Sequence, residues 1–535
     1  MVPSVAGREP IFGSMRKSLI ALLFIVAAGT AAAADFSGKW ALDPSRSTGL
    51  PPGVEQTLVV EASGEKLHVV TTLITDNIDR VIDDMYELGA GEREFPPQMP
   101  GLTPKTAKRT ARRTGERTLE VTDHIEGDNA GGPVTLDIVR VWELSADGRT
   151  LTIDQAVTNA GFTTRSYRVL VQGGGGLASP PIVARMFPVD LNVPVAPTAF
   201  RSGGKTNLVY ELHVTSFRAA DVEWKRLEVL SDDGHPLATY SGAELEKLLT
   251  RPGAAGANKE PRRIGAGLRA VAFLWIPLDG SVPARIHHRA AFTIPASAAA
   301  VERLVDGADV SVRPSPVVIG PPVRGGSWVA RWIGETSFHR RGLMSVDGGA
   351  KISQRFAIDW NRFASDGREW RGEGTVNTDY SVYGQDVIAV ADSVVAKVVD
   401  TIPENVPGSM NPAVTAGIDT AAGNCISLRL ADGSYATYAH LQPGSIRVKE
   451  GQRVRRGDAL ARIGNSGNAT GPHLHFQIST GPMLEGEGLP YAIDSFEVVG
   501  AEDDTPMDGL WSGGSGAPVL HRNELPAEHM VLRFQ

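Results

Sequence analysis

The stretch Gly471-Pro472-His473-Leu474-His475-Phe476 carries two histidines at alternate positions, directly after a glycine-rich turn at residues 464–471. The pattern predicts a short strand. Because side chains alternate between the two faces of a strand, both histidines point to one face, and the leucine and phenylalanine point to the other. Two neighbouring imidazoles can serve a metal ion and its bound water, or they can be polar residues on a solvated face. The surrounding sequence favours the first interpretation.

The composition is that of a turn-rich, mainly β protein. The 535 residues include 59 glycines and 35 prolines, and only 6% are aromatic. Hydrophobic residues make up 42% and charged residues 21%, which is ordinary for a globular protein. A chain of this length exceeds one hydrophobic core, so we expect three domains.

Residues 1–34 predict an upstream extension followed by a signal peptide. Arg16 and Lys17 precede an apolar run at 19–26, and four alanines follow at 31–34. A positive start, a short apolar core and small residues at the end are typical of a cleavable signal. The run is too short to span a bilayer. We therefore expect an exported protein, periplasmic or extracellular, with no permanent membrane span.

Charge and cysteine content exclude several classes of protein. The formal net charge is −8, and removing residues 1–34, which carry +2, takes it to −10. An acidic chain has no general affinity for nucleic acid, and a basic run at 105–113 is expected to be a solvated loop. Cys425 is the only cysteine, so neither an internal disulfide nor a multi-cysteine zinc site can form. Histidine and carboxylate are the metal ligands to expect.

Two β domains are predicted to precede the histidine-rich part. Strand-like runs separated by Gly, Asp and Asn predict an antiparallel barrel or sandwich over residues 35–172. Its opening, Phe-Ser-Gly-Lys-Trp at 36–40, resembles that of lipocalin-like barrels; a ligand pocket and a structural spacer are both open there. A Gly- and Pro-rich linker is expected at 173–204. Residues 205–320 predict an immunoglobulin-like sandwich.

The residues that carry chemistry lie in a predicted domain at 325–498, which is followed by a polar tail at 499–535 with a last possible strand at 531–534. Asp359 ends one strand-like run and His440 lies near the end of another. Between His440 and the first motif, glycines mark the turns of short strand–turn–strand units.

The order of these elements closely resembles the lysostaphin-type (LytM-like) zinc endopeptidases, which cut peptide bonds in bacterial peptidoglycan. That family has Tyr-x-His-Leu, then Val-x-x-Gly-x-x-Val-x-x-Gly, then Gly-x-His-Leu-His-Phe. The three elements stand here in the same order at 438–441, 448–457 and 471–476. The resemblance covers about residues 325–495, is most specific from 384 to 478, and implies an antiparallel β-sheet peptidase domain that binds Zn²⁺.

The resemblance also implies site residues. Asp359 and His475 match zinc ligands, and His440 and His473 match the two histidines that do acid–base and oxyanion work. Which of the two histidines does which stays open. A catalytic zinc takes three protein ligands plus water, whose pKa it lowers to about 7.

One ligand position departs from the family. The family's first ligand is a histidine four residues before the aspartate, and here that residue is Arg355, which stays protonated and does not bind zinc. Either another residue supplies the third bond or the site is degraded. We hypothesise that His339 replaces the missing ligand; the alternative is a solvent-exposed loop histidine. Two long segments, 361–383 and 401–422, are expected to form loops that shape a substrate groove.

The sequence therefore predicts an exported zinc metalloendopeptidase that hydrolyses a peptidoglycan peptide or an exported peptide. The alternative is a non-catalytic module that binds peptidoglycan or regulates another hydrolase with a degenerate metal site, and Arg355 favours it. A third hypothesis makes residues 35–172 a carrier of a lipophilic molecule.

Overall fold

The structure, a computed structural model, is mainly β, as expected. It describes the following residues: 34–51, 53–89, 91–99, 101–173, 181–253, 260–296, 301–414, 417–502, 511, 513 and 516–535. The predicted signal sequence up to residue 33 and residues 174–180 of the predicted linker lie outside them. Within the described residues no helix is long and apolar enough to cross a membrane. The chain divides into two compact units, one made of 1–50, 57–71 and 82–174, the other of 51–56, 72–81 and 175–535.

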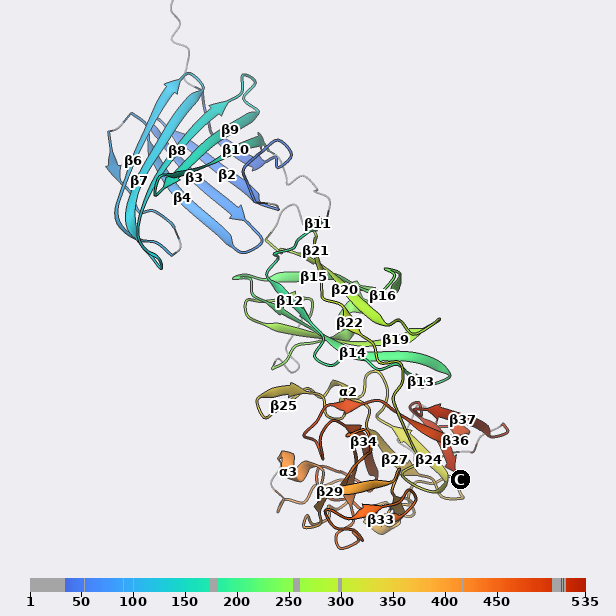
Figure 1. Cartoon of the computed structure of the whole chain (residues 1–535). Coiled ribbons are helices and arrows are strands. Elements are labelled where there is room, and N and C mark those ends of the chain that lie inside the picture. Colours follow the sequence, from blue (N-terminus) through green and yellow to red (C-terminus); the bar gives the residue numbers. More distant parts are fainter. Residues whose placement is uncertain are drawn as a thin grey trace, which may run out of the picture. The chain divides into compact units, whose positions relative to one another are not determined.

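The first unit is built on a ten-stranded sheet in the order β4-β3-β2-β1-β10-β9-β8-β7-β6-β5, which curls on itself (Figure 1). Strands that follow one another in the chain lie side by side, and β1 pairs with β10, so the sheet is an up-and-down meander. A bridge between Leu88 and Ala111 links the end of β4 to β6. Its strands are β1 (Gly38–Leu42), β2 (Glu55–Ser63), β3 (Lys66–Ile74), β4 (Asp79–Glu87), β5 (Arg93–Glu94), β6 (Thr103–Gly115), β7 (Thr118–Asn129), β8 (Gly132–Leu144), β9 (Thr150–Asn159) and β10 (Phe162–Gln172). Its lipocalin-like character stays a prediction.

The basic run at 105–113 is part of strand β6 and not the solvated loop that we expected. Ala107, Arg109 and Ala111 are buried and alternate with more exposed residues. The guanidinium of Arg109 is paired with the carboxylate of Asp123. The many basic side chains hid an alternation with period two, which small alanines do not reveal by hydropathy.

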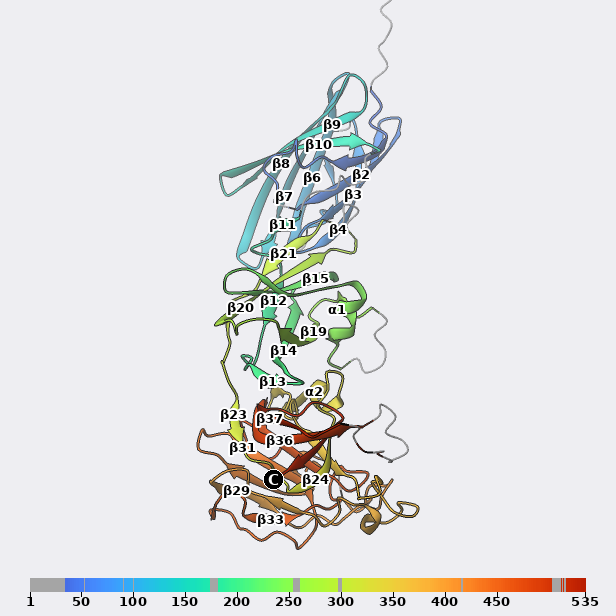
Figure 2. The same ribbon diagram turned by 90° about the vertical axis from the view of Figure 1, so that its right-hand side faces the viewer.

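Strands between residues 182 and 311 form a sandwich of two sheets. One sheet contains β11-β21-β20-β15-β16 with β18 and β22 at its sides, and the other contains β12-β14-β19-β17 with β13. Apolar side chains of both sheets share one core, and the seven-residue helix α1 packs on β16 and β19 (Figure 2). The elements are β11 (Ile182–Val183), β12 (Val189–Asn192), β13 (Phe200–Ser202), β14 (Lys205–Ser216), β15 (Val222–Ser231), β16 (Pro236–Ser241), α1 (Gly242–Leu248), β17 (Leu249–Thr250), β18 (Arg263–Ile264), β19 (Arg269–Leu278), β20 (Arg285–Thr293), β21 (Arg303–Asp306) and β22 (Val310–Ser311).

The C-terminal part contains a twelve-stranded sheet, whose main path is β23-β36-β38-β24-β27-β34-β31-β30-β29-β32. β35 pairs with β34, β37 pairs with β36, and two small sheets, β25-β26 and β28-β33, flank it. The elements are β23 (Val317–Ile319), β24 (Gly325–Arg331), α2 (Phe338–Arg341), β25 (Met344–Val346), β26 (Gly349–Lys351), β27 (Ile358–Arg362), the 3₁₀ helix η1 (Asn377–Asp379), β28 (Asp386–Ile388), β29 (Ser393–Val399), α3 (Ile418–Ala421), β30 (Asn424–Arg429), β31 (Tyr435–Leu441), β32 (Arg453–Val454), β33 (Ala459–Arg462), β34 (Leu474–Ser479), β35 (Gly488–Leu489), β36 (Tyr491–Ala501), β37 (Val519–Glu524) and β38 (Met530–Phe534).

Part of the segment expected to be a tail, 499–535, belongs to this sheet. β38 lies between β36 and β24, and its residues Val531, Leu532 and Phe534 are buried. This strand agrees with the possible last strand expected at 531–534, whereas its place between β36 and β24 depends on partners that are distant in the chain.

Candidate metal centre and catalytic histidines

Three adjacent strands set the centre of the site. On β27, Asp359 lies directly opposite His475 of β34, and His475 lies opposite Ala439 of β31. Leu474 and Phe476 point into the apolar core on the other side of the sheet. The alternation predicted for the motif therefore directs the histidines away from the core and toward the carboxylate.

His440 reaches the same face through an irregularity of its strand. Strand alternation would place its side chain on the other face of the sheet from Ala439 and His475. The register of β31 against β30 shifts here, however, and His440 has a left-handed backbone with φ of 62°. Its ring centroid lies 4.7 Å from that of His473 and 5.8 Å from that of His475. A non-glycine residue in this conformation is costly and is concentrated at functional sites.

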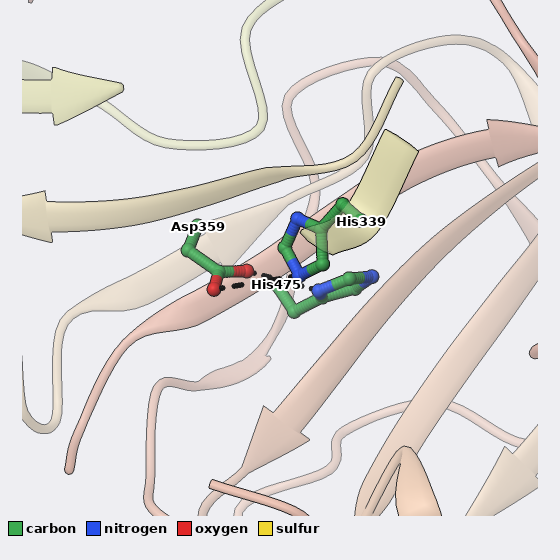
Figure 3. Close-up of side chains that lie close together, drawn as sticks. All are labelled: His339, Asp359 and His475. Carbon is green, nitrogen blue, oxygen red and sulfur yellow. Dashed lines mark hydrogen bonds and ion pairs between the residues drawn. The ribbon is translucent and has the colours of Figure 1, made fainter. Parts of the chain in front are cut away.

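His339 lies on the short helix α2, beside Asp359 and His475 (Figure 3). The helix begins after Ser337, whose hydroxyl accepts a hydrogen bond from the backbone of Arg340. Nε2 of His339 is 3.7 Å from Oδ2 of Asp359, and the rings of His339 and His475 are 4.9 Å apart. The side chain is 2% exposed, so His339 is not the solvent-exposed loop residue of the alternative hypothesis.

Arg355 points away from this cluster. Its guanidinium is buried and forms ion pairs with Glu211 of β14 at 2.8 Å and with Glu487 at 2.9 Å. It also donates to the backbone carbonyl of Gly488 at 2.8 Å. Arg355, at the position of the family's first ligand, therefore pairs with carboxylates outside the cluster.

The three side chains that approach one another fit a zinc ion. One candidate donor atom from each of His339, Asp359 and His475 lies within 4.8 Å of the other two, and all three residues are buried. Nδ1 of His475 is 2.9 Å from Oδ1 of Asp359. Zinc bonds of about 2.0–2.1 Å in a tetrahedron separate ligand atoms by about 3.3 Å, within the range of these spacings. Two nitrogens and one oxygen are a donor set that zinc accepts.

Gln477 fixes the orientation of His475, and sequence reasoning missed it. Its Oε1 lies 3.0 Å from Nε2 of His475, and its amide nitrogen donates to the carbonyl of Met483 at 3.0 Å. Because that carbonyl only accepts, the amide oxygen faces the imidazole and accepts a hydrogen bond from Nε2, so Nδ1, the nitrogen that faces Asp359, is the one that can bind a metal once it gives up its proton. A glutamine two residues after the motif, on the same strand face, was the available signal.

Burial and mutual charge perturb the ionisable groups of the cluster. Burial opposes ionisation of Asp359, but His339, His473 and a hydrogen bond with His475 outweigh it and hold its pKa well below the ordinary value. Burial also opposes the charged form of His475, yet Asp359 raises its pKa above the ordinary value. Burial lowers the pKa of His339 to about 4.

The backbone determines the tautomers of the other two histidines. Nδ1 of His440 is 2.8 Å from the carbonyl of Ser466, and Nδ1 of His473 is 2.9 Å from the carbonyl of Gly471. A carbonyl only accepts, so each Nδ1 carries a proton and each Nε2 is left for other chemistry. Burial, and then the neighbouring His473 and His475, hold the pKa of His440 well below its ordinary value, so it is neutral.

The glycine-rich turn that supplies these carbonyls is held by the segment 401–422. Asn405 donates to the carbonyls of Gly467 and Ala469 at 2.9 and 2.7 Å, and the carboxylate of Glu404 accepts from the backbone of Asn465 at 3.2 Å. The segment predicted as a loop therefore also supports the turn behind His440.

A cavity of about 510 Å³ lies at this turn. Its lining is mostly apolar and comes from β25, from residues on both sides of 415–416 between 410 and 421, and from Gly467, Asn468 and Leu484. Gly467 directly follows Ser466, the residue that accepts from His440. The cavity therefore borders the turn that accepts from His440, and the expected substrate groove stays a prediction.

Comparisons with known proteins agree with this geometry. The family model of Peptidase family M23 matches residues 377–486, which include His440, His473 and His475 but not His339 or Asp359. The chain is 35% identical over 68 residues to "Cell division protein DipM" of Caulobacter vibrioides and 40% identical over 57 residues to "Peptidoglycan DD-endopeptidase ShyA" of Vibrio cholerae. It is 38% identical over 100 residues to an "Uncharacterized metalloprotease" of Haemophilus influenzae.

The alignments with these relatives are short. They cover 13%, 11% and 18% of this chain and 11%, 13% and 17% of the respective relatives. The family match, the antiparallel sheet and the resemblance of the three motifs all concern the C-terminal region. The C-terminal part of the chain therefore contains a domain of peptidase family M23.

Proposed function

We propose that the chain is an exported zinc metalloendopeptidase that hydrolyses peptide bonds of peptidoglycan. One observation carries the proposal: His339, Asp359 and His475 bring their donor atoms within 4.8 Å of one another, beside His440 and His473. Two buried imidazoles and a carboxylate in one cluster, next to two further imidazoles, match what metal-assisted amide hydrolysis needs.

His339, Asp359 and His475 would hold the ion. When bound, zinc supplies Lewis-acid chemistry, because it polarises a carbonyl group and acidifies water. Asp359 is ionised at neutral pH and His339 is neutral, as ligands must be. Gln477 accepts from Nε2 of His475, so Nδ1 is the nitrogen left for the ion.

His440 is our candidate for the general base. Its Nδ1 proton is committed to the carbonyl of Ser466, and its depressed pKa leaves Nε2 unprotonated at neutral pH. An unprotonated imidazole nitrogen can accept a proton from an attacking water. The left-handed backbone of His440 directs this ring toward His473 and His475.

His473 is our candidate for stabilising the developing oxyanion or protonating the leaving amine. Its Nε2 lies 3.5 Å from Oδ2 of Asp359, and its side chain is 15% exposed, more than that of Asp359 at 8%. A group at the boundary between the cluster and solvent can contact a substrate carbonyl or amine directly.

The substrate class rests on the relatives. A relative named as a peptidoglycan endopeptidase favours a cell-wall peptide over an exported protein. The predicted signal peptide favours a periplasmic or extracellular location, where peptidoglycan lies.

The test is metal content followed by hydrolysis. After dialysis against buffer, the mature chain is expected to retain one zinc per chain and to cleave purified wall peptides, and a chelator should abolish the cleavage until zinc is restored. Asp359→Asn is expected to lose both zinc and cleavage. Zinc binding without cleavage of wall peptides would instead indicate the non-catalytic module, and absence of zinc would refute the metalloenzyme.

A further inference from the structure

The β14–β19 sheet of the sandwich is buried on both faces. Leu208, Tyr210 and Leu212 point into the sandwich core, whereas Phe273, opposite Glu211 on the neighbouring strand, packs with Ile352 on the outer face. A strand covered on both sides has no solvated face. The outer face of this sheet therefore supports the segment that lies between His339 and Asp359.

Arg340, the residue next to His339, is attached to this face. Its side chain is fully buried, donates a hydrogen bond to the backbone carbonyl of Leu274 on β19, and lies over the rings of Phe273 and Trp275. It also donates to the carbonyl of Glu335 at 3.3 Å. The helix that carries His339 is only four residues long, so its position depends on contacts of this kind.

Arg355, four residues before Asp359, is attached to the same sheet. Its Nε lies 3.1 and 3.0 Å from the two carboxylate oxygens of Glu211, and its Nη2 pairs with Glu211 and Glu487. Glu211 is 3% exposed. A planar guanidinium with several fixed acceptors leaves little freedom of orientation, so the turn that leads into β27 is held firmly.

Glu211 connects the two attachments. It lies directly opposite Phe273, one residue before Leu274, and its charge favours the charged forms of both Arg340 and Arg355. The side chain of Arg340 has no exposed surface. Loss of the carboxylate would leave two buried cations with less compensation.

We propose that the β14–β19 sheet is the structural support of the metal site. In this proposal Glu211 and Arg340 are positioning residues that hold His339 and Asp359 at the spacing zinc requires. The sandwich thus holds the helix that carries His339, and metal affinity depends on a domain that supplies no ligand. This inference rests on the proposed function.

The first test uses Glu211→Gln in the mature chain. The variant keeps the shape of the side chain and removes its charge, and zinc affinity, measured by competition with a chromogenic chelator, is expected to fall at least tenfold. Asp123→Asn is the matched control, because Asp123 is a buried acid held by two arginines in the first unit. It is expected to bind zinc with the affinity of the wild type.

The second variant is Arg340→Met, which keeps the length and apolar contacts of the side chain but donates no hydrogen bonds. Replacing a desolvated cation by an apolar residue often leaves the fold intact, so this variant decides the matter if Glu211→Gln does not fold. Its zinc affinity is also expected to fall at least tenfold. Near-ultraviolet circular dichroism establishes that each variant retains its tertiary structure.

The outcomes separate the two proposals. If His339→Ala loses zinc but a folded Glu211→Gln or Arg340→Met binds it with wild-type affinity, the structural support by the sheet is refuted and the proposed metal site is not. An equal loss in Asp123→Asn also refutes the structural support, because the effect would then be general. If the wild-type chain binds no zinc, both the metal site and its structural support are refuted.

Discussion

Replacing Gln477 by leucine is the most direct test of how the centre is oriented. The side chain is fully buried, and its amide oxygen lies 3.0 Å from Nε2 of His475. Leucine has nearly the volume of glutamine, so the substitution leaves little cavity. It removes the acceptor of the hydrogen bond from Nε2 of His475, and the donor to the carbonyl of Met483.

Two estimates of the effect agree. A buried donor left without a partner costs about 1–3 kcal/mol. Loss of a residue that orients a metal-ligating histidine typically costs roughly 10–100-fold in metal affinity, which is about 1.4–2.8 kcal/mol. We therefore expect Gln477→Leu to bind zinc about 10–100-fold more weakly than the wild type, with one zinc per chain still reached at saturation.

The assay is chelator competition at constant pH, with thermal unfolding in parallel. Thr437→Val is the matched control, because Thr437 lies opposite Gln477 in the sheet. The substitution removes one buried hydrogen bond, to Ser427, that involves no imidazole. It should lower stability by about 1 kcal/mol and leave zinc affinity unchanged. A folded Gln477→Leu with wild-type affinity would refute the role of Gln477.

Three further results are expected. His339→Ala should lower zinc affinity by more than the roughly 10–100-fold of an orienting residue, since a ligand is removed; unchanged zinc content would exclude His339 from the ligand set. His440→Gln should retain zinc but lose about 10²–10⁴-fold in peptide hydrolysis, and wild-type turnover in that variant would show that another group is the base. Zinc affinity should fall as pH is lowered, beginning above about pH 6.5, because the raised pKa of His475 lets a proton occupy its ligand nitrogen at higher pH than in an ordinary imidazole; a constant affinity from pH 8 to 6 would contradict this.

The glycine-rich turn behind His440 depends on a close approach of two backbone segments. A Cβ at Gly423, which has φ of 60°, would lie 2.3 Å from the carbonyl oxygen of Ser466, the residue that also accepts from His440. Gly423→Ala is therefore expected to lower the free energy of unfolding by more than about 1 kcal/mol. Gly433→Ala, whose Cβ would meet nothing within 4 Å, measures the backbone cost alone in the same melting experiment.

The local pattern around residues 471–476 was sufficient to predict a strand with two histidines on one face, because side-chain alternation is a property of the strand itself. The same pattern, read with the motifs at 438–441 and 448–457, led to the M23 domain that the family match shows. Strand alternation did not predict that His440 turns to the same face, since its left-handed φ and the register shift beside it depend on the pairing of β31 with β30.

By itself the sequence indicated that the chain is mainly β, and it predicted that any metal would be held by histidine and carboxylate and that Arg355 is not a ligand. Only the tertiary structure decided that His339 lies against Asp359 and that Arg355 pairs with Glu211, 144 residues away in the chain. The reason is physical: a ligand set or a buried ion pair depends on which distant segments pack together, and the spacing of residues along one strand carries no information about that packing.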